Sequence, residues 1–535
     1  MNKKVVIIFC LLLITTSVIS ANAAVNYEKE RTEKPKDISN LLAGWIEKQQ
    51  LLASDGGITD QFGYCVDIDG DYAIVSSFGD NSYAGSAYIF KYDGSSWVEQ
   101  QKLTASDAQD NDRFNRVSIC GDYAVVGAWG CSLFSGAAYV FERSGSTWTE
   151  QQKLIPSDPA QNDYFGISTD IDGDYIVVGA YYKNNVQGAA YVFKRDGSTW
   201  SQQAKLTASG GTAGDRFGIC VSIDGEYILV GAEGDGNDEG AAYVFVRSGS
   251  VWTQQQKLEA LDGADGDRFG INVCIDEDYA LVGAFIDDSE KGSAYVFKRS
   301  GTSWAQETKL IAAGGTAGDR FGGSVSIDGE YAVIGAYYDD NKKGSAYVFK
   351  RSGTTWTQDQ KLTASTPVTE DWFGIDVAID GFDILIGAYG DDDKGLNAGC
   401  AYIFGQDNNA PNPPLITGPP DGKVGNIYTY IFTSTDSDGD DVSYYIKWGD
   451  GATSGWTAFQ SSGASYSEDY SWAAQSTYTI EAKAKDTFGL ESTWSTFTVV
   501  MPRSRNINNP FICYLQNLLD LHPNLFPILR ILMDS

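Results

Sequence analysis

The stretch from Asp319 to Leu362 reads DRFGGSVSIDGEYAVIGAYYDDNKKGSAYVFKRSGTTWTQDQKL and contains four short strand patterns. The first pattern ends at Asp328-Gly329, which is typical of a two-residue hairpin turn because both residues tolerate positive φ. Three more strand patterns follow, with an acidic loop at 337–343 and a turn at Ser352-Gly353: residues 330–336, 345–350 and 356–362. The inner strands are apolar on both faces, which predicts a sheet sandwiched between neighbouring sheets, as in a propeller blade.

The same unit occurs seven times, as two series of landmark residues show. A phenylalanine two residues after an aspartate recurs every 51 or 52 residues: Phe62, Phe114, Phe165, Phe217, Phe269, Phe321 and Phe373. A tryptophan followed six residues later by leucine recurs in step: Trp45, Trp97, Trp148, Trp200, Trp252, Trp304 and Trp356. Seven units of about 50 residues predict one seven-bladed β-propeller and not a row of separate domains.

The order of the landmarks predicts how the ring closes. A tryptophan strand at Trp45–Leu51 precedes the first phenylalanine, and none follows the last Ala-Tyr-Ile-Phe strand at Tyr402. The last blade therefore lacks an outer strand of its own, and the N-terminal strand is spare. Pairing the two closes the propeller without a covalent bond and removes an exposed sheet edge.

The repeated motifs resemble the FG-GAP repeat family, which includes the integrin α-subunit propeller and many microbial surface proteins. The motifs are Asp-x-Phe-Gly, Ile-Asp-Gly-(Asp/Glu)-Tyr and Gly-(Ala/Ser)-Ala-Tyr-Val-Phe, and they cover about residues 55–405. Two copies depart from them, with Asn115 in place of glycine and Ser76-Ser77 in place of Gly-Ala. The resemblance implies an extracellular or cell-surface protein that acts in recognition or adhesion.

The N-terminus predicts export. Lys3 and Lys4 precede an apolar run, and Ala21-Asn22-Ala23 is a small-residue cleavage site, so residues 1–23 are interpreted as a signal peptide. A linker at 24–42 and the propeller at 43–406 follow.

A second, smaller domain is expected after a Pro- and Asn-rich linker at 407–414. Alternating strand patterns at 428–432, 442–448, 476–482 and 496–500 predict an immunoglobulin-like β-sandwich over 415–501. Trp448-Gly449-Asp450-Gly451 resembles the turn of PKD-type domains, which usually act as extracellular spacers. The tail at 502–535 could pack on the sandwich, lie at a membrane surface or act as a sorting signal; it is the only part through which we expect membrane association. The predicted fold class is all-β.

Composition excludes several classes of function. A formal net charge of -32 repels phosphates, so we expect no nucleic-acid partner. The single histidine is His522, in the tail, so the propeller has no imidazole base or zinc ligand. The eight cysteines form no CxxC pair and are interpreted mainly as small buried hydrophobic residues.

Calcium is the one cofactor that the sequence suggests, through acidic loops whose alternative interpretation is plain solvation. The candidate ligands fall in two loops after second strands and in one segment of the sandwich: Asp235, Asn237, Glu239, Asp391, Asp392, Asp393, Asp436, Asp438 and Asp440. The metal-binding loop of integrin-type repeats is not expected here, because a tight hairpin takes its place and supplies too few oxygen ligands. The aspartate two residues before each landmark phenylalanine is interpreted as a cap of its own loop, with a ring of cation ligands as the alternative.

Ligand binding is expected at the loops after the second strands, which vary most between copies. Several of them begin with aromatic residues that suit a sugar or a protein partner: Trp129, Tyr181, Tyr182, Tyr337, Tyr338 and Tyr389. The same residues could equally anchor the loops by packing.

Together these observations predict a secreted or cell-surface recognition or adhesion protein that binds an extracellular protein or glycan through its propeller loops. Residues repeated equally in every blade are more often scaffold than catalyst, so we expect a binding protein and not an enzyme. Two alternatives stay open: a carbohydrate-active propeller enzyme with paired carboxylates, and a structural component of the cell envelope.

Overall fold

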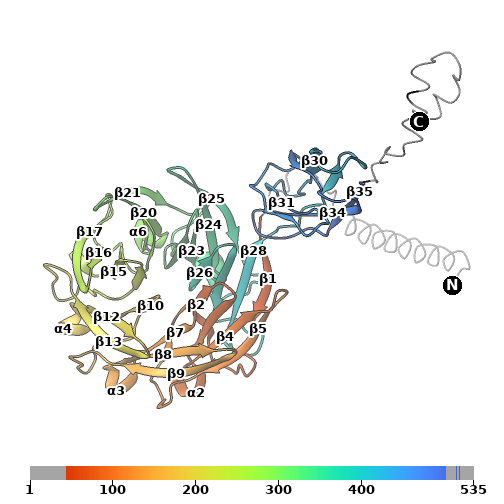
Figure 1. Ribbon diagram of the computed structural model, residues 1–535. Helices are drawn as coiled ribbons and strands as arrows, with labels where there is room; N and C mark the ends of the chain where they lie inside the picture. The colour runs from red at the N-terminus through yellow and green to blue at the C-terminus, as the bar shows by residue number, and fades with distance from the viewer. Residues whose placement is uncertain (1–43, 502–513, 515–516, 518–535) are drawn as a thin grey trace, which may run out of the picture. The chain divides into compact units, whose positions relative to one another are not determined.

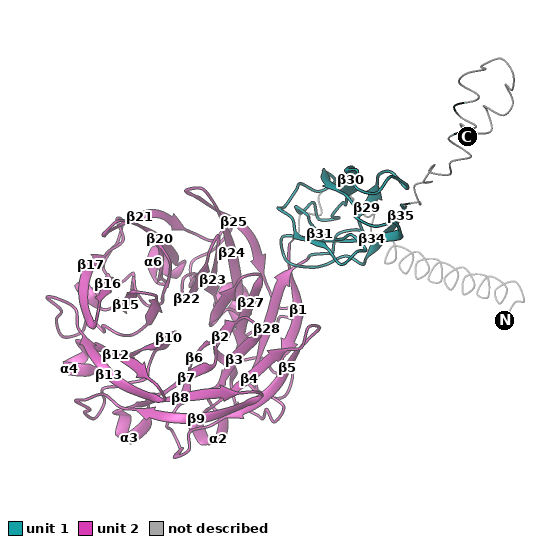
Figure 2. Ribbon diagram, in the orientation of Figure 1, with its two compact units in different colours: residues 1–43, 408–535 teal, residues 44–407 magenta. Residues whose placement is uncertain are grey.

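The computed structural model describes residues 44–501 together with Tyr514 and Asn517. The predicted signal peptide at 1–23, the linker at 24–42 and the rest of the tail at 502–535 lie outside the described residues. The described chain forms two compact units, residues 44–407 and 408–501 (Figure 2). No helix among the described residues is long and apolar enough to cross a membrane.

The first unit is a seven-bladed propeller (Figure 1), as the repeats predict. The innermost strands of the blades lie around the centre: β2 (Phe62–Asp69), β6 (Phe114–Cys120), β10 (Thr169–Asp172), β14 (Val221–Asp224), β18 (Val273–Asp276), β22 (Ser324–Asp328) and β26 (Val377–Asp380). The second strands are β3 (Tyr72–Ser77), β7 (Tyr123–Ala128), β11 (Tyr175–Ala180), β15 (Tyr227–Ala232), β19 (Tyr279–Ala284), β23 (Tyr331–Ala336) and β27 (Asp383–Ala388).

The outer half of each blade is built from the Ala-Tyr-(Val/Ile)-Phe strand and the tryptophan strand. The third strands are β4 (Ser86–Tyr92), β8 (Ala137–Ser144), β12 (Ala189–Asp196), β16 (Ala241–Ser248), β20 (Ser293–Ser300), β24 (Ser345–Ser352) and β28 (Cys400–Gln406). The fourth strands, at the rim, are β5 (Trp97–Leu103), β9 (Thr147–Leu154), β13 (Thr199–Leu206), β17 (Val251–Leu258), β21 (Ser303–Leu310), β25 (Thr355–Leu362) and β1 (Trp45–Leu51).

Strand β1 fills the rim of the last blade, as the order of the landmarks predicts. The sheet order is β1-β28-β27-β26, and Trp45 is paired with Gln406 and Leu51 with Ala401. The ring is also closed at its centre, because the backbone N–H of Gly70 in the first blade donates to the Asp380 carboxylate of the last at 2.6 Å.

Apolar side chains hold the blades face to face. Strand β3 is buried at all six positions, and six of the seven landmark phenylalanines pack edge-on against the tyrosine of their own third strand, such as Phe321 on Tyr347 at 5.5 Å between ring centres. The last aspartate of an inner strand accepts a hydrogen bond from the next blade's turn, as Asp328 does from Gly381 N–H at 2.6 Å. The six described cysteines are unpaired.

Six loops after second strands form a single turn each: α2 (Asp80–Tyr83), α3 (Cys131–Phe134), α4 (Lys183–Val186), α5 (Asp235–Asp238), α6 (Asp287–Glu290) and α7 (Asp339–Lys342). In each of them three consecutive residues have positive φ; in α2 these are Asn81, Ser82 and Tyr83, at 50°, 60° and 61°. These turns are therefore left-handed, and only the last blade replaces the turn with an open loop at 389–399.

The second unit is a β-sandwich of two sheets, ordered β29-β30-β33 and β32-β31-β34-β35. Its strands are β29 (Leu415–Thr417), β30 (Tyr428–Thr433), β31 (Ser443–Lys447), β32 (Thr453–Trp456), β33 (Ser465–Tyr470), β34 (Thr477–Lys485) and β35 (Ser495–Val500). Its core contains Trp448 and Trp472, whose indole N–H donates to the Trp448 carbonyl at 3.0 Å. Strands β29, β32 and β33 are additional to the four that the sequence predicts.

Candidate functional site

The inner strands of all seven blades line a central channel with a volume of about 330 Å³. Small-molecule sites in proteins commonly occupy about 300–1,000 Å³, so the channel is large enough to take in a small ligand or the end of a larger one. The strands place the channel on the propeller axis, where side chains from every blade converge.

Two positions of the inner strand break the sevenfold repeat where they line the channel. The position next to the bulged Phe-Gly segment carries Cys65, Arg116, Ser168, Cys220, Asn272 and Asp376. The position two residues further carries Asp67, Ser118, Asp170, Ser222, Cys274, Ser326 and Ala378. Three carboxylates, one guanidinium and three thiols therefore meet in one channel, at positions that the repeat pattern does not predict because they differ from blade to blade.

The channel carboxylates also join neighbouring blades. Asp67 accepts a hydrogen bond from Ile119 N–H at 2.8 Å, and Asp170 accepts one from Ile223 N–H at 2.7 Å. Ser222 makes the corresponding bond to the next blade with its hydroxyl. Because serine performs the same task, joining the blades does not by itself require a carboxylate.

Burial sets the protonation of these groups. It raises the pKa of Asp170 to about 6, and it raises the pKa of Asp67 well above its usual range, with the nearby Asp170 adding to the effect. Both side chains touch the channel but little bulk water, so their charge is poorly solvated. Arg116 is the only cationic side chain among the residues that line the channel.

A ring of aromatic and charged side chains surrounds one end of the channel, and we call it the mouth ring. It consists of the residue after each second strand, the residue before each landmark phenylalanine in blades two to seven, and Tyr64. Its members are Tyr64, Phe78, Arg113, Trp129, Tyr164, Tyr181, Arg216, Glu233, Arg268, Phe285, Arg320, Tyr337, Trp372 and Tyr389. Tyr64, Phe285 and Tyr337 also line the channel, which places the ring at its mouth.

One part of the mouth ring is a stack of aromatic rings. Tyr64 stacks on Phe78 at 4.8 Å between ring centres and lies 5.6 Å from Tyr389. Trp372 stacks on Tyr389 at 5.5 Å and on Tyr337 at 6.0 Å. The contacts of Tyr64 with Tyr389 and of Trp372 with Tyr337 join different blades, so the stack is held by three neighbouring blades.

In a second part, a guanidinium lies between aromatic rings. Arg113 lies 4.1 Å from the centre of the Trp129 ring and 5.7 Å from that of Phe78. Trp129 packs edge-on against Tyr164 at 5.4 Å between ring centres, and Tyr164 stacks on Tyr181 at 5.6 Å. Cation–π contacts of this kind fix both partners and leave part of the charge available to a ligand.

The third part is ionic. Arg216 and Arg268 lie 3.2 Å and 3.9 Å from the buried Glu233 carboxylate. Burial raises the pKa of Glu233, although both arginines act against that shift. Arg268 and Arg320 lie 5.9 Å and 5.8 Å from the centre of the Phe285 ring. With four arginines and one glutamate, the ring carries formal charge +3 on a strongly acidic chain.

The structure brings the predicted ligand-binding aromatics together. Trp129, Tyr181, Tyr337 and Tyr389 belong to the mouth ring. Tyr182 and Tyr338 directly follow two of these and pack on ring members, Tyr182 at 5.0 Å from Tyr164 and Tyr338 at 4.8 Å from Trp372. They pack on one another and also surround an opening, and their part in binding stays a prediction.

Sequence reasoning missed the residues that interleave with these aromatics. A signal was present, because the residue between the repeated aspartate and phenylalanine is an arginine in four copies: Arg113, Arg216, Arg268 and Arg320. A basic residue that recurs in an acidic chain marks a position with a specific partner.

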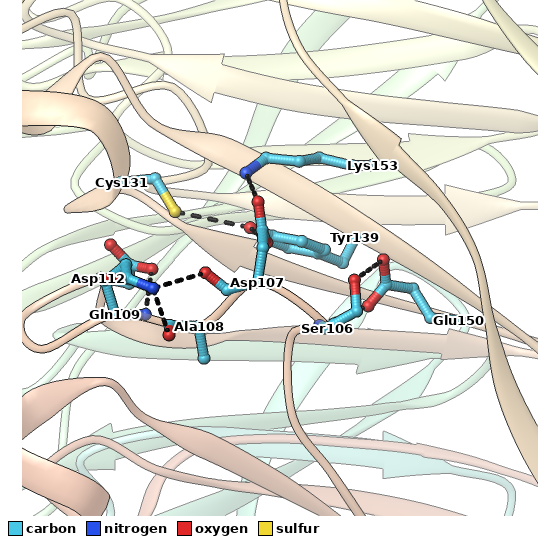
Figure 3. A network of polar contacts seen from close by, with 9 residues as sticks. All are labelled: Ser106, Asp107, Ala108, Gln109, Asp112, Cys131, Tyr139, Glu150 and Lys153. Atoms are coloured by element: carbon cyan, nitrogen blue, oxygen red, sulfur yellow. Dashed lines mark hydrogen bonds and ion pairs between the residues drawn. The ribbon is translucent and has the colours of Figure 1, made fainter.

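The carboxylates of the loops around the mouth mostly have partners within the propeller. In the second blade (Figure 3), Asp107 accepts a hydrogen bond from the Tyr139 hydroxyl and forms an ion pair with Lys153, both at 2.7 Å. The Cys131 thiol lies 3.6 Å from the same hydroxyl. Asp112 accepts from Gln109 N–H at 2.8 Å, and its six counterparts make the same bond, so these seven aspartates cap their own loops.

The two predicted calcium loops of the propeller show the same use of carboxylates. Asp235 binds the Tyr243 hydroxyl and lies 3.1 Å from the Lys257 ammonium, which supplies a positive charge. In that loop Asn237 has a left-handed backbone, and Glu239 ends the turn. Among the described residues neither propeller loop gathers three carboxylates around one point.

The second of these loops spreads its three carboxylates over different partners. Asp391 accepts from the Tyr402 hydroxyl at 3.1 Å, Asp392 from Asn397 N–H at 2.6 Å and Asp393 from the Gln50 amide at 2.9 Å. Calcium binding by either loop stays a prediction.

The sandwich does gather its predicted ligands. One oxygen each of Asp436, Asp438 and Asp440 lies within 4.8 Å of the others, and this is the only such cluster in the described part of the chain. Asp436 is buried, and Oδ2 of Asp436 and of Asp440 has no hydrogen-bond partner. Burial and the neighbouring Asp436 raise the pKa of Asp440. Buried, unpartnered carboxylate oxygens suit a hard cation such as calcium.

Comparison with known proteins agrees with the repeats. The FG-GAP repeat model matches seven segments: 45–90, 97–141, 148–193, 200–245, 252–297, 304–349 and 356–404. These segments cover more than half of the chain, which therefore belongs to the FG-GAP repeat family. Such repeats are typical of propellers that act in adhesion and recognition, and proteins that carry them are typically extracellular or at the cell surface.

Two solved structures are similar to a smaller part of the chain. One is the PKD domain of an M14-like peptidase from Thermoplasmatales archaeon SCGC AB-540-F20, at 44% identity, 18% of this chain, 99% of that chain and a TM-score of 0.18. The other is the CARDB domain of a Pyrococcus furiosus protein in complex with di-metal ions, at 12% identity, 18% of this chain, 91% of that chain and a TM-score of 0.14. No curated protein matches the chain.

Proposed function

We propose that this protein is exported and acts as a recognition protein that binds a glycan at the mouth of its propeller channel. The mouth ring is the observation that carries the proposal. Aromatic faces suit the apolar faces of sugar rings, and the interleaved arginines supply donors for sugar oxygens. The channel below has room for a terminal sugar, and its carboxylates supply acceptors for hydroxyl groups.

The packing of the ring supports a binding role further. Trp129, Tyr181 and Tyr389 are held by neighbours on both sides and are only partly buried. A surface whose side chains are already fixed loses little conformational entropy when a ligand binds. A protein partner that inserts a loop is the second candidate, since aromatic residues and arginine are also enriched where proteins bind each other.

A glycosidase is the enzymatic alternative, and the channel is the observation that favours it. An acid with a pKa of about 6, such as Asp170, beside further carboxylates has the composition that glycoside hydrolysis needs. We prefer binding because Asp67 and Asp170 have oxygens engaged by backbone N–H groups of neighbouring blades.

We further propose that the sandwich binds calcium through Asp436, Asp438 and Asp440. Their clustered, partly unpartnered oxygens support this site. In that role the ion would offset two of the three negative charges and stabilise the turn that holds them.

The test is retention of the purified full chain on a glycan panel, with released products measured in the same incubation. Trp129→Ala and Tyr389→Ala should each weaken retention about tenfold, because loss of a central aromatic contact commonly costs more than 1 kcal/mol. Tyr92→Ala is the matched control, since Tyr92 is an exposed aromatic residue at the end of β4 that lies away from the mouth ring.

Each outcome has a distinct meaning. Retention that the ring variants lose supports glycan binding. Released sugars indicate the glycosidase, and equal retention of all variants places the binding site elsewhere. No retention on any glycan contradicts the proposal and favours a protein partner or a structural role.

A further inference from the structure

One face of the sandwich carries most of the positive charge of its domain. Between residues 415 and 501 there are four lysines and no arginine, against eleven acidic residues. Three of the lysines lie on the sheet β32-β31-β34-β35: Lys447, Lys483 and Lys485. The fourth, Lys423, lies between β29 and β30 of the other sheet. Such segregation of charge in an acidic domain indicates a surface with a specific partner.

Strand alternation puts these lysines on the outer face. On β31, Tyr444 and Ile446 are buried in the core, while Tyr445 and Lys447 are only half-buried. On β34, Ala482 and Ala484 are buried, and the lysines on either side of Ala484 point the other way. The face is therefore opposite to the core and open, as far as the described residues reach.

Aromatic side chains from three segments lie among the lysines. Tyr445 packs edge-on against Trp456 at 5.5 Å and against Trp494 at 6.1 Å between ring centres. Trp494 is 39% exposed, although its size would suit a core. Tryptophan in such a position on a sheet face is typical of a contact surface.

The indoles hold the lysines in place. The Lys447 ammonium lies 3.9 Å from the centre of the Trp494 ring, and that of Lys485 lies 4.5 Å from the centre of the Trp456 ring. The Lys483 ammonium lies between the two rings, 5.3 Å from Trp456 and 5.2 Å from Trp494. These contacts order three flexible side chains before any partner binds, which lowers the entropic cost of binding.

The face retains charge that its own carboxylates do not neutralise. Glu481 lies 3.4 Å from Lys447, and Glu491 forms an ion pair with Lys483. Within the described chain, no carboxylate lies in ion-pair distance of Lys485. The three lysines and the two glutamates give the face a formal charge of +1. The rest of residues 415–501 contains one lysine and nine acidic residues, a formal charge of -8.

We propose that this basic–aromatic face, made of Tyr445, Lys447, Trp456, Lys483, Lys485 and Trp494, binds an acidic polysaccharide. The lysines provide point charges for a series of carboxylate or sulfate groups, and the indole edges contact the sugar rings between them. A sheet face with charges on two strands suits an extended polymer better than a single small anion. This site lies in a different unit from the mouth ring and does not depend on it.

The test is affinity electrophoresis of the full chain through gels that contain polygalacturonate, in EGTA so that calcium does not bridge carboxylates. Retardation is expected, and it should decrease as NaCl rises, because exposed charge pairs are screened. Lys485→Gln and Trp494→Ala should each weaken binding about tenfold, the usual worth of one charge-assisted contact. Lys423→Gln changes the same charge outside the face and should stay within about twofold of the parent protein.

Three results would overturn the proposal. The first is equal retardation by neutral dextran, which would remove the role of charge. The second is binding to phosphatidylglycerol vesicles without binding to polygalacturonate or dextran sulfate, which would make the face a lipid contact. The third is an equal loss in the Lys423→Gln control. Thermal unfolding of every variant separates loss of binding from loss of fold.

Discussion

At the scale of single residues, the turn between the first two strands of each blade shows what the repeat requires. Its first residue has a left-handed backbone and is glycine in six blades: Gly70, Gly121, Gly173, Gly225, Gly329 and Gly381. The fifth blade has Glu277 there, at φ 48°. The sequence predicts Asp-Gly as the turn pair, whereas the structure ends the strand at the aspartate and starts the turn at the glycine.

Glu277→Gly should stabilise the propeller. A side chain in left-handed backbone costs about 1 kcal/mol or more, and the bond from this residue's N–H to Asp224 at 2.7 Å does not need the side chain. We expect the free energy of unfolding to rise by about 1 kcal/mol in urea titrations. Glu226→Gly, at a turn position without positive φ, should destabilise slightly; equal effects of the two substitutions would contradict the argument.

Residue-level prediction from the sequence succeeded where side chains repeat and failed where they do not. The landmark phenylalanines and the capping aspartates could be assigned because seven copies show the same spacing. Arg116, Asp170 and the other channel residues occupy positions that differ from blade to blade. Only the geometry of the ring brings such residues together, so their spacing along the chain does not predict that they meet.

At the scale of elements, the closing strand β1 differs from every other rim strand. The Gln360 side chain accepts from Trp45 N–H at 2.8 Å and donates to the Trp45 carbonyl at 2.6 Å. Gln256 makes the same pair of bonds to Trp304 at 2.8 Å and 2.7 Å. The difference lies in the chain connection. Strand β21 directly follows β20 of the same blade in the chain, whereas β1 is joined to the last blade by non-covalent contacts alone.

Gln360→Ala should therefore loosen β1 locally, while Gln256→Ala should not release β21. Loss of two hydrogen bonds costs about 1–3 kcal/mol, which raises the population of a released strand roughly 5- to 160-fold. Limited proteolysis followed by mass spectrometry should show faster cleavage next to Leu51 in Gln360→Ala only. Equal cleavage of the two variants would contradict this view, as would unchanged thermal stability after deletion of residues 40–53.

The strands that the sequence missed share a physical reason. Strand β33 reads Ser-Tyr-Ser-Glu-Asp-Tyr, with only two apolar positions, and β32 contains Gly455. Both are stabilised by pairing and by the packing of a few aromatic rings, such as Tyr466 on Tyr444 at 6.0 Å. Tertiary contacts decide such strands, because local propensity is weak there.

At the scale of the whole molecule, the described chain consists of two compact units with separate cores. We expect two transitions in calorimetry, since each unit has its own hydrophobic core. Calcium should raise the midpoint temperature of the sandwich transition alone, because a calcium concentration 100 times the Kd adds about 2.7 kcal/mol to the free energy of unfolding of that unit. Asp436→Asn should abolish the shift and Asp391→Asn should not; a shift of the propeller transition instead would place calcium in the propeller loops.

Strand β1 has a further consequence for how the propeller is made. It is the first strand of the propeller to be synthesised, and its pairing partner β28 is the last. At typical rates of translation the two are separated by roughly 20 to 70 s, during which the growing chain exposes an unpaired edge. Until β28 pairs with β1 of its own chain, it can instead pair with the β1 strand of another nascent chain. Crowded synthesis should therefore yield exchanged dimers, in which each chain completes the other.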